Sequence, residues 1–211
     1  MESLLERLQI KPDEWDWLLI GDGSGSNWNT SAGWGVISVC RRTGNREAWW
    51  GGMSKGTVNL AEMLAYIQPL SWIAAERKRL KQKSFIRVHI ITDSQYCQGQ
   101  GDKGQAALSP KANGALWRIF DDFERRGIIL TWHWLEREAC ELNLLADAIS
   151  KQARQQYVPA EKGQTSAVLT KAHAAASGLP ENKLTAYNPS EPENPDKPPR
   201  RKKRRKKART P

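Results

Sequence analysis

The fold prediction rests on the stretch Trp17-Leu-Leu-Ile-Gly-Asp-Gly-Ser-Gly-Ser26. The apolar run from Trp17 to Ile20 has the composition of a buried strand, and it ends on a carboxylate, Asp22. The glycines and serines that follow predict a tight turn. A charge at the end of a core strand is expensive to desolvate, so Asp22 requires a metal ion, a basic side chain or solvent beside it.

The pattern of the remaining chain predicts an α/β fold with a five-stranded mixed sheet flanked by helices. Strands over 16–22, 33–40 and 46–53 are separated by short turns, which indicates an antiparallel meander. A long amphipathic helix to about residue 80 and a strand over 85–92 follow, so this strand should lie parallel to the first. The sequence then predicts a loop over 97–112, a helix over 113–126, a strand over 128–135 and a helix over 141–156.

Composition divides the chain into four parts. Residues 1–14 predict an N-terminal lead-in helix, and residues 15–157 hold the material for one folded domain, including all ten tryptophans. Residues 158–197 are poor in large apolar groups and predict a flexible linker. Residues 198–211 predict a disordered basic tail.

The net charge of +10 is concentrated in that tail. Residues 200–209 contain nine lysines and arginines, and subtracting these nine charges leaves +1 for the rest of the chain. A tail of this kind is expected to bind nucleic acid without sequence preference through its phosphates. A solvated tail or a nuclear localisation signal is the alternative interpretation.

Three widely spaced cysteines argue against a disulfide framework and against a structural zinc site. The N-terminus lacks the features of a signal peptide, and no apolar run has the length of a membrane span. We therefore expect a cytoplasmic monomer that does not bind membranes, or a nuclear protein if the host is eukaryotic.

Four carboxylates occupy positions that the predicted fold can bring together. Asp22 and Asp93 each follow a strand, and parallel neighbouring strands would place both at one sheet edge. Glu62 lies near the start of the long helix, one position off its apolar stripe, and Asp147 lies in the last helix. Taken singly, Glu62 or Asp147 is more often a solvated helix residue, and Asp22 and Asp93 could be turn-forming residues at strand ends. Together they favour bound Mg²⁺ or Mn²⁺, since clustered acids repel one another without cations.

Four short motifs in this order resemble those of the type 1 ribonuclease H family and its relatives fused to reverse transcriptases. The resemblance covers roughly residues 15–156, and its motifs are Asp22-Gly-Ser-Gly-Ser26, Asn59-Leu-Ala-Glu62, Thr92-Asp-Ser-Gln95 and Asn143-Leu-Leu-Ala-Asp147. It implies a catalytic domain over 15–157 that hydrolyses the RNA strand of RNA–DNA hybrids. In this family the acids that match Asp22, Glu62, Asp93 and Asp147 bind two Mg²⁺ ions, and cleavage leaves 5′-phosphate and 3′-hydroxyl ends.

The resemblance also implies which residues contact the hybrid. At two places this sequence departs from the pattern of many family members. The implied contacts are Gly23, Ser24, Asn59, Gln95, Arg137 and Asn143. Arg137 stands where many members carry a mobile histidine, and a permanently charged arginine can hold a phosphate but cannot shuttle protons. The segment 97–112 lacks the extra basic helix of some bacterial members. Two other functions are the alternatives to hybrid cleavage. One is a non-catalytic nucleic-acid-binding protein, and the other is a related DNA-directed nuclease of the resolvase or transposase kind.

Overall fold

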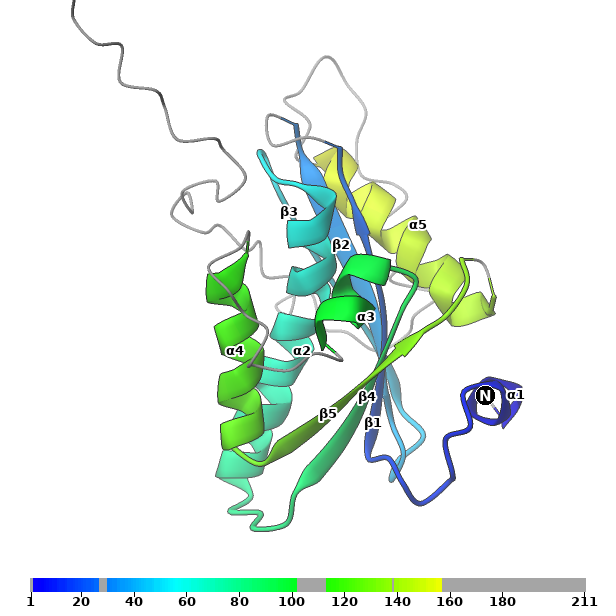
Figure 1. Cartoon of the computed structure of the whole chain (residues 1–211), viewed down its shortest axis with the longest axis vertical. Helices are drawn as coiled ribbons and strands as arrows, with labels where there is room; N and C mark the ends of the chain where they lie inside the picture. The colour runs from blue at the N-terminus through cyan, green and yellow to red at the C-terminus, as the bar shows by residue number, and fades with distance from the viewer. Residues whose placement is uncertain (1, 27–29, 102–112, 138, 157–211) are drawn as a thin grey trace, which may run out of the picture.

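The computed structural model describes residues 2–26, 30–101, 113–137 and 139–156. Its centre is a five-stranded sheet in the order β3-β2-β1-β4-β5 (Figure 1). The strands are β1 (Trp17–Ser24), β2 (Ala32–Cys40), β3 (Arg46–Met53), β4 (Ile86–Thr92) and β5 (Ile128–Trp134). The first three pair antiparallel, whereas β4 runs parallel to both β1 and β5. The predicted mixed sheet is therefore confirmed.

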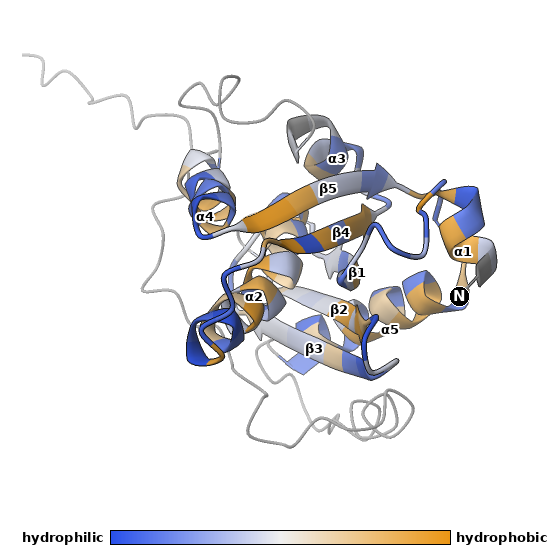
Figure 2. Cartoon of the chain, turned by 90° about the horizontal axis from the view of Figure 1, so that it is seen from below, coloured by the Kyte–Doolittle hydropathy of each residue, from blue (hydrophilic) through white to orange (hydrophobic). Residues whose placement is uncertain are grey.

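The helices lie on both faces of this sheet. They are α1 (Glu2–Arg7), α2 (Val58–Arg79), α3 (Gln95–Gly101), α4 (Gly114–Arg125) and α5 (Glu141–Gln156). Figure 2 looks along the sheet, with α2 and α4 on one side and α1 and α5 on the other. Among the described helices, none combines the length and the apolar character that a bilayer-spanning segment needs.

Each face of the sheet carries its own hydrophobic core. The core beneath α2 and α4 includes Trp34, Tyr66 and Phe120, and the core beneath α1 and α5 includes Leu4, Leu18 and Ile149. Alternation along β1 explains the division, because Leu18 and Ile20 face one core while Leu19 faces the other. The lead-in segment is thus packed onto the domain through Leu4, although its helix ends at Arg7.

Two local predictions were wrong. The turn predicted after Asp22 begins later along the chain, because β1 continues to Ser24 and remains paired with β2 as far as Gly33. The predicted loop over 97–112 begins with helix, since α3 extends to Gly101. Residues 102–112 lie outside the described residues, and so do the predicted linker and the predicted basic tail. The division of the chain into domain, linker and tail therefore stays a prediction.

The registers of β1 fix where the candidate site lies. β1 pairs with β4 only from Trp17, opposite Val88, to Ile20, opposite Ile91. Asp22 and Asp93 each lie two residues beyond that last pair, so they stand at matching positions past the point where the two strands separate. Two strands that are parallel and in register thus bring two acids to one edge of the sheet.

Candidate metal centre

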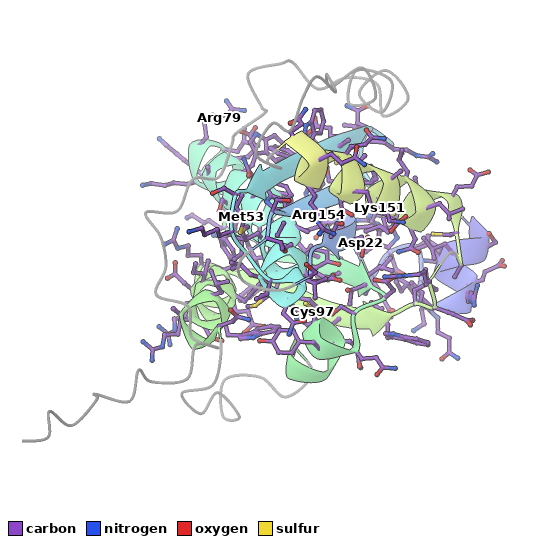
Figure 3. The ribbon with its side chains drawn as sticks, turned by 90° about the horizontal axis from the view of Figure 1, so that it is seen from above. Asp22, Met53, Arg79, Cys97, Lys151 and Arg154 are labelled. Atoms are coloured by element: carbon purple, nitrogen blue, oxygen red, sulfur yellow. The ribbon has the colours of Figure 1, made fainter. Side chains whose placement is uncertain are left out.

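Three of the four predicted acids meet at that edge. One carboxylate oxygen each from Asp22, Glu62 and Asp93 lies within 4.8 Å of the other two. Asp22 is 1% exposed and Glu62 is 4% exposed, so this cluster lies largely inside the protein. Figure 3 looks onto this edge from above and shows Asp22 near the middle of the molecule, with Lys151 on the neighbouring helix α5.

Close packing at glycines brings the acid-bearing helices to the sheet. A Cβ atom on Gly23 would lie 2.5 Å from the backbone nitrogen of Glu62, so a larger residue would push α2 away from β1. On the other face, a Cβ on Gly33 would lie 2.1 Å from the backbone nitrogen of Arg154. A Cβ on Gly35 would likewise lie 2.8 Å from the carbonyl oxygen of Ala146, which would displace α5.

Burial and mutual repulsion make the ionised cluster unfavourable without a cation. Burial, followed by the charges of Asp93 and Asp147, raises the pKa of Asp22 to about 7. Burial, followed by the charges of Asp22 and Asp93, raises the pKa of Glu62 well above its ordinary value. A backbone hydrogen bond from Gly23 to Glu62 opposes the second shift.

The cluster fits a divalent cation. Asp22 Oδ1 and Glu62 Oε2 are buried and have no hydrogen-bond partner among the described residues. Buried carboxylate oxygens are normally satisfied, so two unpaired ones in one cluster indicate ligands for a cation. A donor set of carboxylate oxygens alone suits Mg²⁺ or Mn²⁺. Asp22, Glu62 and Asp93 are therefore the residues that would hold such an ion.

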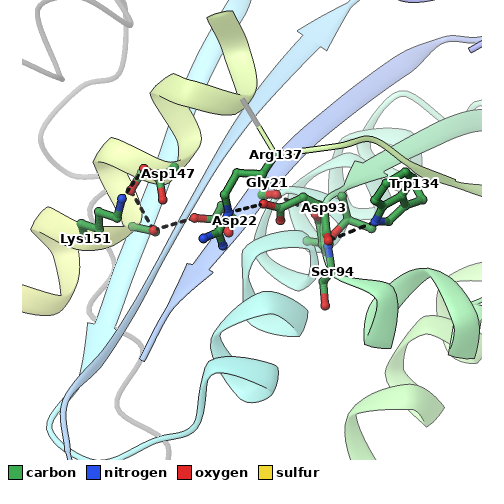
Figure 4. Close-up of polar contacts among 11 residues, drawn as sticks. Gly21, Asp22, Asp93, Ser94, Trp134, Arg137, Asp147 and Lys151 are labelled. Carbon is green, nitrogen blue, oxygen red and sulfur yellow. Dashed lines mark hydrogen bonds and ion pairs between the residues drawn. The ribbon is translucent and has the colours of Figure 1, made fainter. Parts of the chain in front are cut away.

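Asp147 lies at the outer side of this cluster and is not one of the three (Figure 4). Its Oδ2 atom accepts a hydrogen bond of 2.6 Å from Lys151 Nζ, one helical turn further along α5. Ser150 connects it to Asp22, because Ser150 Oγ lies 2.9 Å from the carbonyl oxygen of Asp147 and 3.1 Å from Asp22 Oδ2. Its charge raises the pKa of Asp22, after burial and the charge of Asp93, so Asp147 belongs electrostatically to the group.

Two residues at the end of β5 hold Asp93. Arg137 Nε donates to Asp93 Oδ2 at 3.0 Å, and Trp134 Nε1 donates to the carbonyl oxygen of Asp93 at 3.1 Å. Both side chains remain partly in solvent, with Arg137 65% exposed and Trp134 44% exposed. Arg137 therefore lies beside the acids, as its sequence position predicted, and it is accessible to a ligand.

The other predicted contact residues differ in their exposure. Gln95 at the start of α3 is exposed, and Ser24 and Asn59 are half-buried. Gly23 is buried under α2, and this close packing explains a glycine at position 23 without any ligand. Asn143 is only 2% exposed, which does not favour direct contact with nucleic acid in this conformation. The nucleic-acid-binding roles of these residues stay predictions.

Sequence reasoning missed two residues that support the acids. Ser150 is fully buried and donates to Asp22, yet its only signal in the sequence is its position three residues after Asp147. Tyr66 is fully buried one turn after Glu62. His133 does not belong to this group, since its Nε2 lies 2.8 Å from His89 Nδ1 in a separate pair.

The fold and the acid cluster together define a protein with the ribonuclease H fold. The N-terminal RNase H domain of rv2228c from Mycobacterium tuberculosis superposes with a TM-score of 0.51 and 18% identity, over 67% of this chain and 94% of that one. LC11-RNase H1, solved in complex with an RNA/DNA hybrid, superposes with a TM-score of 0.52 and 19% identity, over 66% of this chain and 97% of that one. No protein-family model and no curated protein sequence matches the chain.

Proposed function

We propose that this protein is a metal-dependent endoribonuclease that hydrolyses the RNA strand of RNA–DNA hybrids, leaving 5′-phosphate and 3′-hydroxyl ends. The observation that carries the proposal is the cluster of Asp22, Glu62 and Asp93, whose ligand atoms lie within 4.8 Å of one another at one sheet edge. A protein that only binds nucleic acid gains nothing from burying repelling carboxylates beside each other. The ribonuclease H fold, shared with a structure solved on an RNA/DNA hybrid, supports the same substrate.

The four acids would hold two Mg²⁺ ions in this scheme. Asp22, Glu62 and Asp93 form the inner group, and Asp147 lies at its outer side, joined to Asp22 through Ser150. When bound, the two ions would supply an activated water and neutralise charge on the leaving oxygen of the phosphodiester. Burial of Asp22 and Glu62 excludes solvent from the ligand oxygens, which strengthens their interaction with a cation.

Residues around the acids would position the hybrid. Arg137 is exposed beside Asp93, so its guanidinium can contact a phosphate. Gly23, Ser24, Asn59 and Gln95 would contact the sugars and phosphates of the hybrid, and recognition of the 2′-hydroxyl would distinguish RNA from DNA. Asn143 is buried within α5, so it would support these contact residues from inside the domain.

The decisive experiment presents the full chain with a labelled RNA–DNA hybrid, duplex DNA and duplex RNA of one sequence. We expect Mg²⁺-dependent cleavage of the RNA strand in the hybrid alone, and loss of cleavage in the Asp22→Asn variant. Cleavage of duplex DNA instead would assign the protein to the DNA-directed nucleases. Binding without any cleavage would make it a non-catalytic nucleic-acid-binding protein.

We also propose that the basic segment 198–211 tethers the nearly neutral domain to nucleic acid. Its clustered lysines and arginines support this proposal, because each phosphate contact releases counterions and makes binding dependent on salt. If about six charges meet phosphates, affinity should fall roughly 10³-fold between 50 and 200 mM salt. Deleting 198–211 should raise the KM for the hybrid at moderate salt and spare kcat, whereas an unchanged KM would exclude the tether.

A further inference from the structure

The strands that carry Asp22 and Asp93 separate just before they reach these acids. Their last paired residues are Ile20 and Ile91. Where two parallel strands separate, their backbone carbonyls no longer have a donor on the facing strand, and a buried carbonyl without a donor is unfavourable. Gly21 and Ile91 lie at this fork; Gly21 directly precedes Asp22, and Ile91 lies two residues before Asp93, which follows β4.

The hydroxyl group of Tyr66 occupies the fork. Tyr66 Oη lies 3.0 Å from the carbonyl oxygen of Gly21 and 3.1 Å from that of Ile91, so its single hydrogen is shared between the two strands. The side chain is fully buried, and burial raises the pKa of Tyr66 well above its ordinary value, which keeps the hydroxyl protonated as a donor. One phenol group thus bonds to β1 and β4 at the same time.

The ring of Tyr66 is held firmly in this position. Gly21 leaves the space for it, because a Cβ on residue 21 would lie 2.7 Å from Tyr66 Cε1. Trp132 of β5 packs against the ring edge-on, with 5.6 Å between the ring centroids. Tyr66 also lies one helical turn after Glu62, so α2 presents the tyrosine and the third acid on one face.

We propose that Tyr66 is a positioning residue that sets the separation of Asp22 and Asp93, and thereby the affinity of the site for divalent cations. The shared hydroxyl bonds to both strands and keeps them from moving apart. Without the hydroxyl, two buried carbonyls lose their donor and both strand ends can shift. Cation binding tolerates little such movement, because the carboxylates that bind the ion depend on the residues that hold them in place. The inference rests on the metal site of the proposed function and not on its substrate.

The test compares Tyr66→Phe with a matched control, Ser38→Ala. Ser38 is also a buried hydroxyl in the sheet; its Oγ accepts a 3.0 Å hydrogen bond from Trp49 Nε1, and it belongs to β2 rather than to the fork. Mn²⁺ binding is measured by calorimetry and by electron paramagnetic resonance without nucleic acid. The Mn²⁺ binding of Asp22→Asn is subtracted from that of each protein, which leaves the binding at the acid cluster. Urea unfolding without metal gives the stability of each variant.

We expect Tyr66→Phe to bind Mn²⁺ about fivefold more weakly than the wild type, the effect of about one lost hydrogen bond. Ser38→Ala should lose comparable stability and keep wild-type affinity. At saturating metal, the KM for the hybrid should be the same in all three proteins. Wild-type Mn²⁺ affinity in Tyr66→Phe would overturn the proposal, and so would equal weakening in Ser38→Ala.

The same measurements separate this inference from the proposed function. A wild-type protein that binds no metal overturns both. A wild-type protein that binds metal, loses affinity in Tyr66→Phe and cuts no hybrid supports the inference and overturns the proposed activity.

Discussion

Replacing Asp22 by asparagine should stabilise the metal-free protein above pH 7 and abolish its metal binding. The pKa of Asp22 is raised from an ordinary value of 3.8 to about 7. Between these values the folded protein holds a proton that the unfolded chain has released, so stability falls as the pH rises through this interval. Above pH 7 the ionised carboxylate destabilises the metal-free fold, and asparagine removes that charge.

The size of the effect follows from the same shift. A rise in pKa from 3.8 to about 7 corresponds to about 4 kcal/mol, at about 1.4 kcal/mol per pH unit. This value is an upper bound, because movement of neighbouring carboxylates and entry of water relieve part of the repulsion. We expect Asp22→Asn to gain about 2 kcal/mol at pH 8 and about half as much at pH 5.5, where the folded wild type still holds the proton but its unfolded chain has already released it. Asparagine also keeps an oxygen that accepts the hydrogen bond from Ser150.

Urea unfolding followed by tryptophan fluorescence, in the presence of a chelator, measures this difference at both pH values. Adding Mg²⁺ at pH 8 should stabilise the wild type and leave Asp22→Asn unchanged, because only the wild type keeps its ligand set. Asp16→Asn is the matched control. Asp16 lies directly before β1, but its Oδ2 accepts a 2.8 Å hydrogen bond from the backbone N–H of Arg87, so its loss should give no gain at pH 8. A variant Asp22→Asn that is no more stable than the wild type at pH 8, or equally stabilised at pH 5.5, would refute the reasoning.

Three further predictions concern residues around the acids. Ser150→Ala removes a hydrogen bond that favours the ionised form of Asp22, so half-maximal Mn²⁺ binding should move to higher pH in a titration series. Arg137→Ala frees Asp93 from its ion pair, so calorimetry should show roughly threefold tighter Mn²⁺ binding without nucleic acid, while kinetics show a higher KM for the hybrid. Burial and the nearby His89 lower the pKa of His133 to about 4, so stability is lost as the pH falls from about 6.5 to 4. The His133→Phe variant should lose about 1 kcal/mol less stability over this pH range. Unfolding midpoints measured across the same range test this.

The sequence predicted the mixed sheet because its helices and strands follow from local patterns. Alternating and helical periodicities fix the elements, and parallel pairing of the first and fourth strands brings Asp22 and Asp93 to one edge. The exact position of the turn could not be predicted in the same way. The strand continues past Asp22 because β2 stays paired with it, and that pairing depends on residues outside the motif.

The supporting residues could not be predicted because they act across long sequence separations. Ser150 is 128 residues from the carboxylate that it donates to, and Tyr66 is 45 residues from Gly21. Glu62 was expected one position off the apolar stripe, yet it is buried because Gly23 lets α2 approach β1. Such contacts follow from the distance between a helix and a sheet, which a single sequence does not reveal.

The structure explains how four neighbouring acids are tolerated in a folded, metal-free protein. Two of the four acids are paired with basic side chains, Asp93 with Arg137 and Asp147 with Lys151. No ion pair joins Asp22 or Glu62 to a basic side chain within the described residues, and their raised pKa values let them take up protons instead. Divalent cations would therefore replace both protons and basic side chains, and their binding should release protons and free Arg137 for a phosphate. Metal affinity and substrate affinity are thus expected to rise together with pH.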